Sequence, residues 1–137
     1  MASIFELEQP VFDRMNASIE LVAASDEATT LTAAQSVNSL VVMTPTAGRN
    51  VTTATAAAIV AELGSGVRVG TTFRIILRNQ AAATYAMTLV GGTGVTLDAD
   101  NTNTAAAAST REFIGRVTAI ASGSEAVAVY SMPSGTH

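Results

Sequence analysis

Short runs of alternating hydrophobic and polar residues fill most of the chain from residue 28 onward. The alternation is clearest in residues 71–78, where Phe73, Ile75 and Leu77 fall on one side and only Ile76 interrupts the polar side. Because successive side chains of a strand point to opposite faces, these runs predict half-buried strands. Turn-forming residues separate the runs, which are residues 28–32, 38–44, 71–78, 84–90, 95–97, 110–120 and 125–132.

The spacing of these runs predicts a mainly β fold, an antiparallel sandwich or barrel that resembles a jelly roll. Residues 84–90 should place Tyr85, Met87 and Leu89 on one side. We expect one β domain at residues 28–132, a tail at 133–137 and a loop or irregular edge at 98–108.

One segment has the pattern of a short helix. Small, helix-favouring residues surround Ile59, Val60 and Leu63 within residues 54–63. Thr52 or Thr53 can cap the first turn, because a hydroxyl oxygen accepts a hydrogen bond from an early backbone N–H. Gly64 follows as a helix stop. The sequence therefore predicts a single short helix near residues 53–63.

Residues 1–27 differ from the rest because they combine acidic and large apolar residues. Residues at helical spacing (Val11, Met15, Ile19 and Val22) favour a helix, whereas residues 19–22 fit a strand equally well. We interpret this region as an N-terminal arm or satellite element. It lacks the basic and apolar regions of a signal peptide, and no apolar run in the chain approaches the length of a membrane span.

Charge is unusually scarce. Charged residues make up 13% of the chain, against about 25% in a typical globular domain. Because interface cores are depleted in charge, this composition favours a surface that other chains cover. The net charge of −4 and the lack of a basic stripe argue against nucleic-acid binding.

The residue types that carry catalysis or bind metals are nearly absent. The chain has no cysteine, and its one histidine is the terminal His137. Residues 98–109 begin like a calcium loop, but Asn103 and Ser109 stand where glycine and glutamate are needed. The sequence therefore predicts a protein that is not an enzyme and needs no cofactor.

The β region resembles the trimeric decoration (capsid cement) proteins of tailed-bacteriophage heads. The resemblance covers about residues 28–132, and its motifs specify a scaffold of alanine-, threonine- and glycine-rich strands without a defined site. The segments that carry it are residues 30–35, 54–63, 69–79, 88–97 and 122–130.

This resemblance implies a homotrimer that binds the major capsid protein on the outer surface of the virion and stabilises the expanded shell after assembly in the host cytoplasm. The N-terminal arm is a candidate shell contact through Ile4, Phe5, Leu7, Val11 and Phe12, although the arm could equally pack on its own domain. Arg74 and Arg78 are candidates for ion pairs across a subunit boundary. The alternative hypotheses are a tail-fibre or receptor-binding module and a small glycan-binding β module.

Overall fold

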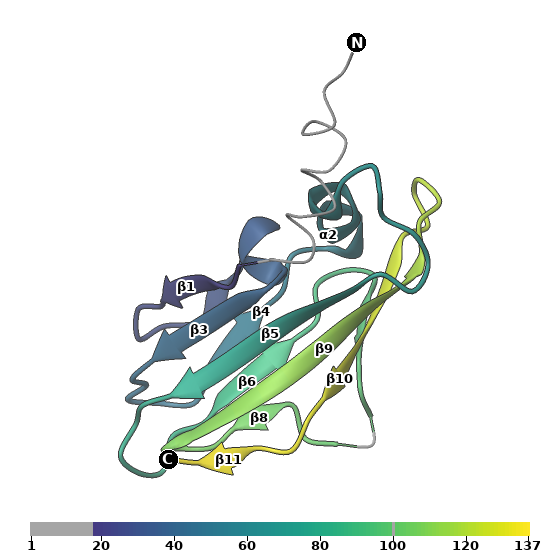
Figure 1. Ribbon diagram of the computed structural model, residues 1–137. Coiled ribbons are helices and arrows are strands. Elements are labelled where there is room, and N and C mark those ends of the chain that lie inside the picture. Colours follow the sequence, from purple (N-terminus) through teal and green to yellow (C-terminus); the bar gives the residue numbers. More distant parts are fainter. Residues whose placement is uncertain (1–17, 100) are drawn as a thin grey trace.

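The computed structural model describes residues 18–99 and 101–137, and these residues form two β-sheets packed face to face (Figure 1). The larger sheet has seven strands and the smaller one has four. The larger sheet contains β1 (Glu20–Ala23), β3 (Ser39–Met43), β5 (Thr72–Asn79), β7 (Val95–Leu97), β9 (Ser109–Ala119), β10 (Ala126–Ser131) and β11 (Gly135–Thr136). The smaller sheet contains β2 (Thr29–Thr30), β4 (Arg49–Thr52), β6 (Met87–Val90) and β8 (Thr104–Ala105). The prediction of a mainly β, sandwich-like fold is thus confirmed.

The sheets are mixed, which corrects the expected antiparallel, jelly-roll-like arrangement. The chain passes from one sheet to the other at every connection from β1 to β8. As far as β6, each strand lies beside the preceding strand of its own sheet and runs in the same direction. In this way β1, β3 and β5 pair in parallel, as do β2, β4 and β6. Antiparallel pairing is found where β9 meets β5, β10 and β11, and where β6 meets β8.

The core lies between the two sheets and follows the predicted alternation. Phe73, Ile75 and Leu77 of β5 are buried against the smaller sheet, where Val51 and Leu89 are also buried. On β9 and β10 the buried set includes Phe113, Val117, Val127 and Val129. These residues supply the hydrophobic stabilisation that holds the layers together.

The predicted helix is present as α2 (Ala56–Leu63), but it begins later than expected. Thr55 has an extended backbone, and its Oγ1 accepts a hydrogen bond from the N–H of Ala58 at 3.2 Å. Thr55 is therefore the N-cap in place of Thr52 or Thr53, since Thr52 belongs to β4. Gly64 ends the helix with a positive φ of 85°, as the helix stop requires. Ile59 and Ala56 anchor α2 in the core.

Several local features differ from the sequence prediction. Residues 20–23 form the edge strand β1 beside β3, which agrees with the strand alternative for residues 19–22 and joins this end of the arm to the larger sheet. Part of the C-terminal tail forms β11 beside β9. Strand β6 begins at Met87, so Tyr85 is 41% exposed instead of sharing the buried side with Met87 and Leu89. Thr84, with a φ of 79°, belongs to the turn that precedes β6. A short 3-10 helix, η1 (Ala34–Ser36), precedes β3.

Candidate interaction surface

The outer face of the larger sheet carries large apolar side chains that the smaller sheet does not cover. Leu21, Leu40 and Ile76 lie in register across β1, β3 and β5 and form one apolar row. Leu21 is 66% exposed, while Leu40 and Ile76 are half-buried. We call this surface the outer face; its apolar members are Leu21, Leu40, Val42, Ile76, Ile114 and Tyr130.

The outer surface of the smaller sheet has the opposite character. Its outward positions carry short polar side chains, with Val90 as the apolar exception. The polar members are Thr30, Asn50, Thr52, Thr88 and Thr104. The two exteriors of the sandwich thus differ in chemistry, because the larger sheet carries large apolar side chains beside charged ones such as Arg74 and Glu112.

The local sequence explains why the outer face is apolar. In β3, every residue from Leu40 to Met43 is apolar, and β5 contains the unbroken run Ile75-Ile76-Leu77. Continuous apolar runs are typical of parallel strands that are covered on both faces. Here the smaller sheet covers one face of β3 and β5, and among the described residues no second layer covers the other.

A groove of about 1060 Å³ lies at the end of the sandwich beside the outer face. One wall is the connection between α2 and β5, which includes Arg68 and Val69. The lining also includes Ile19, Arg74 and Ile114. Val69 is 53% exposed and Ile19 is 39% exposed, so the groove combines exposed apolar side chains with two arginines.

Hydrogen bonds fix the wall that contains Arg68. The N–H of Gly70 donates to the carbonyl of Val117 at 2.8 Å, and the N–H of Val117 donates to the carbonyl of Thr71 at 2.9 Å. The Thr71 hydroxyl accepts from the N–H of Arg68 at 3.1 Å. Gly70 has a φ of 97°, a conformation that favours glycine. The wall is therefore attached to β9.

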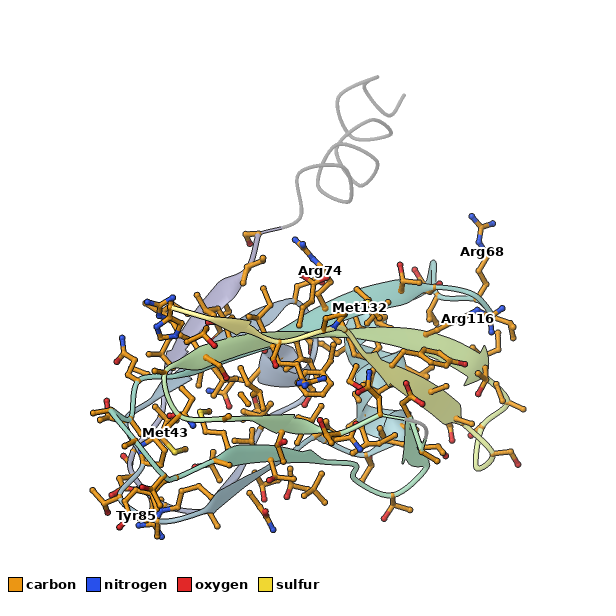
Figure 2. The ribbon with its side chains drawn as sticks, turned by 90° about the horizontal axis from the view of Figure 1, so that it is seen from below. Met43, Arg68, Arg74, Tyr85, Arg116 and Met132 are labelled. Atoms are coloured by element: carbon orange, nitrogen blue, oxygen red, sulfur yellow. The ribbon has the colours of Figure 1, made fainter. Side chains whose placement is uncertain are left out.

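The two arginines predicted as interface residues both lie on the outer side of β5. Arg74 stands on the side away from the smaller sheet (Figure 2), and its Nη1 lies 3.8 Å from Oε2 of Glu112 on β9. Arg78 is half-buried farther along the strand, in register with Val42 and Thr110. Arg74 thus has an acidic neighbour within its own chain, which the sequence alone did not indicate. The other candidates (Ile4, Phe5, Leu7, Val11 and Phe12) lie outside the described residues.

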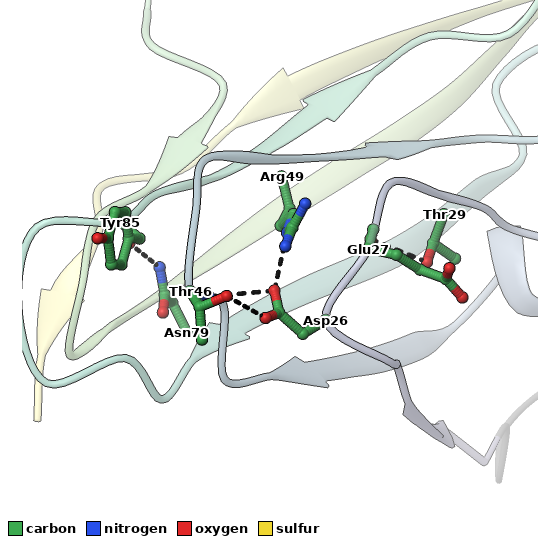
Figure 3. Close-up of polar contacts among 7 residues, drawn as sticks. All are labelled: Asp26, Glu27, Thr29, Thr46, Arg49, Asn79 and Tyr85. Carbon is green, nitrogen blue, oxygen red and sulfur yellow. Dashed lines mark hydrogen bonds and ion pairs between the residues drawn. The ribbon is translucent and has the colours of Figure 1, made fainter.

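A polar cluster ties the β1–β2 connection to the β3–β4 connection and the start of β4 (Figure 3). The Asp26 carboxylate accepts hydrogen bonds from Nε of Arg49 at 2.7 Å, from the backbone N–H of Thr46 at 3.1 Å and from the Thr46 hydroxyl. These bonds, above all the one from Arg49, hold the pKa of Asp26 well below its usual range. Because these side chains bond to one another, we interpret the cluster as a structural connection between the two loops.

The described residues contain no group of three or more histidine, cysteine, aspartate or glutamate side chains that could hold a metal ion. In the segment that begins like a calcium loop, Asp100 is outside the described residues, and Nδ2 of Asn103 donates to the carbonyl of Asp98 at 3.3 Å. Across 18–99 and 101–137, no helix is long and apolar enough to cross a membrane.

The sandwich places this chain in the mainly β class of proteins. Comparison with protein-family models, with curated proteins and with solved structures finds no match. The outer face and the groove are therefore the features on which a functional proposal depends. Sequence reasoning missed most of the outer face. The sequence indicated this face only through Ile76, the apolar residue that interrupts the polar side of residues 71–78.

Proposed function

We propose that this chain is a structural virion protein that binds the outside of a bacteriophage capsid as a homotrimer and stabilises the expanded shell. The observation that carries the proposal is the apolar outer face over the parallel strands β1, β3 and β5. Parallel sheets are normally covered on both faces, so a second polypeptide on this face would complete the packing. A sister copy and the major capsid protein are the two proposed partners.

The composition supports the same proposal from a different direction. Charged residues make up 13% of the chain, and the apolar row of Leu21, Leu40 and Ile76 adds an exposed hydrophobic surface. Apolar patches of this kind mark protein-protein contacts in many proteins. A shell protein stabilises only the state that it binds, and identical contacts repeated around a shell add through multivalency.

The mass of the native particle tests the trimer first. Sedimentation equilibrium of the full chain at neutral pH should give three times the chain mass of 13.9 kDa. A particle that remains at 13.9 kDa at high micromolar concentration would contradict the trimer.

Binding to shells tests the cement role. The full chain should bind expanded, undecorated heads of a tailed phage at a fixed number of copies per head and raise the temperature at which those heads disassemble. Unexpanded heads serve as the control. Equal binding to both forms, or stoichiometric binding without stabilisation, would contradict the role.

One observation favours a second candidate, a tail-fibre or receptor-binding and glycan-binding β module. Strands β1 to β6 alternate between the sheets and stack in parallel, as successive coils of a β-solenoid do. Solenoids often present extended binding surfaces. Binding to host cells or their surface glycans, without binding to heads, would favour this candidate over the first.

A further inference from the structure

The groove beside the outer face has a chemical character that suits a particular kind of ligand. Its lining includes two arginines, Arg68 and Arg74, and exposed apolar residues. No aspartate or glutamate belongs to the lining, and the acidic neighbour of Arg74, Glu112, lies outside it at 3.8 Å. A third arginine is close by, because Nη2 of Arg116 lies 3.8 Å from where a Cβ on Gly70 would stand. A segment that combines acidic and apolar side chains would match this surface.

The chain itself contains such a segment. Residues 4–13 include Glu6, Glu8 and Asp13, together with Ile4, Phe5, Leu7, Val11 and Phe12. In residues 5–8, apolar and acidic residues alternate. In an extended conformation Phe5 and Leu7 would face one side, and Glu6 and Glu8 the other. This segment could therefore contact apolar and cationic groups at the same time.

Chain connectivity places this segment within reach of the groove. Ile19 is part of the groove lining, and the chain leads from it directly to residues 4–13. Asp13 lies six positions before Ile19, a span of up to about 20 Å when the chain is extended. A short tether gives an effective concentration on the order of millimolar, which favours the chain's own segment over that of another copy in dilute solution.

We propose that the groove binds residues 4–13 of its own chain, with the acidic side chains beside Arg68 and Arg74 and the apolar ones against Ile19 and Val69. This inference concerns the isolated chain and does not depend on the proposed virion role.

Cysteine cross-linking in the full chain tests the proposal cleanly, because the natural sequence contains no cysteine. The test variant carries Leu7→Cys with Val69→Cys, and the matched control carries Leu7→Cys with Tyr85→Cys. Val69 and Tyr85 are 53% and 41% exposed, and Tyr85 lies far from the Arg68 end of the molecule in Figure 2. Disulfide formation is followed in a glutathione buffer at low micromolar protein, with products resolved by mass.

The test pair should form an intramolecular disulfide at least about tenfold faster than the control pair, as expected for a docked segment. Arg74→Gln should slow this reaction. Arg78→Gln, on the same side of β5 but outside the groove, should leave it unchanged. Circular dichroism checks that every variant is folded.

Three results would overturn the proposal. Equal rates for the two cysteine pairs would show that the segment does not prefer the groove. Covalent dimers as the main product would assign the segment to a second copy. If Arg74→Gln and Arg78→Gln change the rate equally, the proposed contact between Arg74 and the acidic side chains of the segment is ruled out. All three results can be obtained without phage heads, so a failure here is distinct from a failure of the virion proposal.

Discussion

At the residue scale, Gly115 lies in the middle of β9, where the ring of Phe73 on β5 occupies the space that a side chain would need. The two residues are in register, and a Cβ on Gly115 would lie 2.2 to 2.6 Å from three carbons of that ring. The backbone of Gly115 is thus covered by an aromatic ring. The glycine is required by this close approach.

Gly115→Ala should destabilise the protein by about 1–3 kcal/mol, because overpacking forces Phe73 or the backbone to move. Urea unfolding followed by circular dichroism measures the change. Gly48→Ala is the matched control, since a Cβ there meets nothing within 4 Å. Equal stability of the two variants would mean that the ring moves aside freely.

Asp26 provides a residue-scale prediction about pH. Its pKa is lower in the folded protein than in the unfolded chain, so its bonds to Arg49 and Thr46 stabilise the fold fully above the unfolded pKa of about 3.9. That contribution is lost as the pH falls below this value toward the folded pKa. The melting temperature of the natural protein should therefore decrease more steeply than that of Asp26→Asn between about pH 5 and about pH 2, the interval around and below the unfolded pKa. Parallel curves would contradict the assignment.

At the element scale, one buried arginine joins three segments of the chain. Arg111 of β9 is 7% exposed. Its Nε donates to the carbonyl of Thr104 in β8 at 2.7 Å, its Nη1 donates to the carbonyl of Met132 at 2.8 Å, and its Nη2 donates to the Ser134 hydroxyl at 3.2 Å. The side chain thus connects β9 with β8 and with the segment that leads into β11.

Arg111→Met should destabilise the protein by roughly 2–4 kcal/mol, because two carbonyls lose a charged donor and a buried unsatisfied acceptor costs about 1–3 kcal/mol. Hydrogen exchange should show the largest loss of protection in β8 and β11. Arg111→Lys can restore at most part of this network. Uniform loss of protection over the whole chain would indicate that Arg111 does not act through these two elements.

The elements also show how far sequence reasoning reaches. The alternation in residues 71–78 correctly identified which side chains of β5 face the core, because strand periodicity depends only on the strand itself. Pairing direction depends on which sheet the chain enters next, and residues 44–48 between β3 and β4 look like an ordinary turn. Arg111 was missed for a related reason, since its acceptors come from residues 7 and 21 positions away.

The candidate surface was predicted in part. Arg74 and Arg78 do lie on the outward side of β5. The sequence did not indicate that Glu112 on the neighbouring antiparallel strand approaches Arg74. The apolar row emerged only from strand register, because Leu21, Leu40 and Ile76 belong to three separate segments.

At the scale of the whole molecule, the sandwich has two exteriors of different chemistry, and this asymmetry predicts which one would form the contacts of the proposed trimer. Leu21 is 66% exposed on the outer face, so a charged residue can replace it without entering the core. Asn50 is exposed on the smaller sheet and serves as the matched position.

Leu21→Glu should weaken self-association at least about tenfold, since burying an unpaired carboxylate in a contact costs more than about 1.4 kcal/mol. Asn50→Glu, which adds the same charge on the polar exterior, should leave association unchanged. Sedimentation equilibrium over a range of concentrations measures both, and thermal unfolding at low concentration checks that each chain keeps its fold. If Asn50→Glu disrupts association and Leu21→Glu does not, the smaller sheet is the contact face, and the apolar row of the larger sheet needs another explanation.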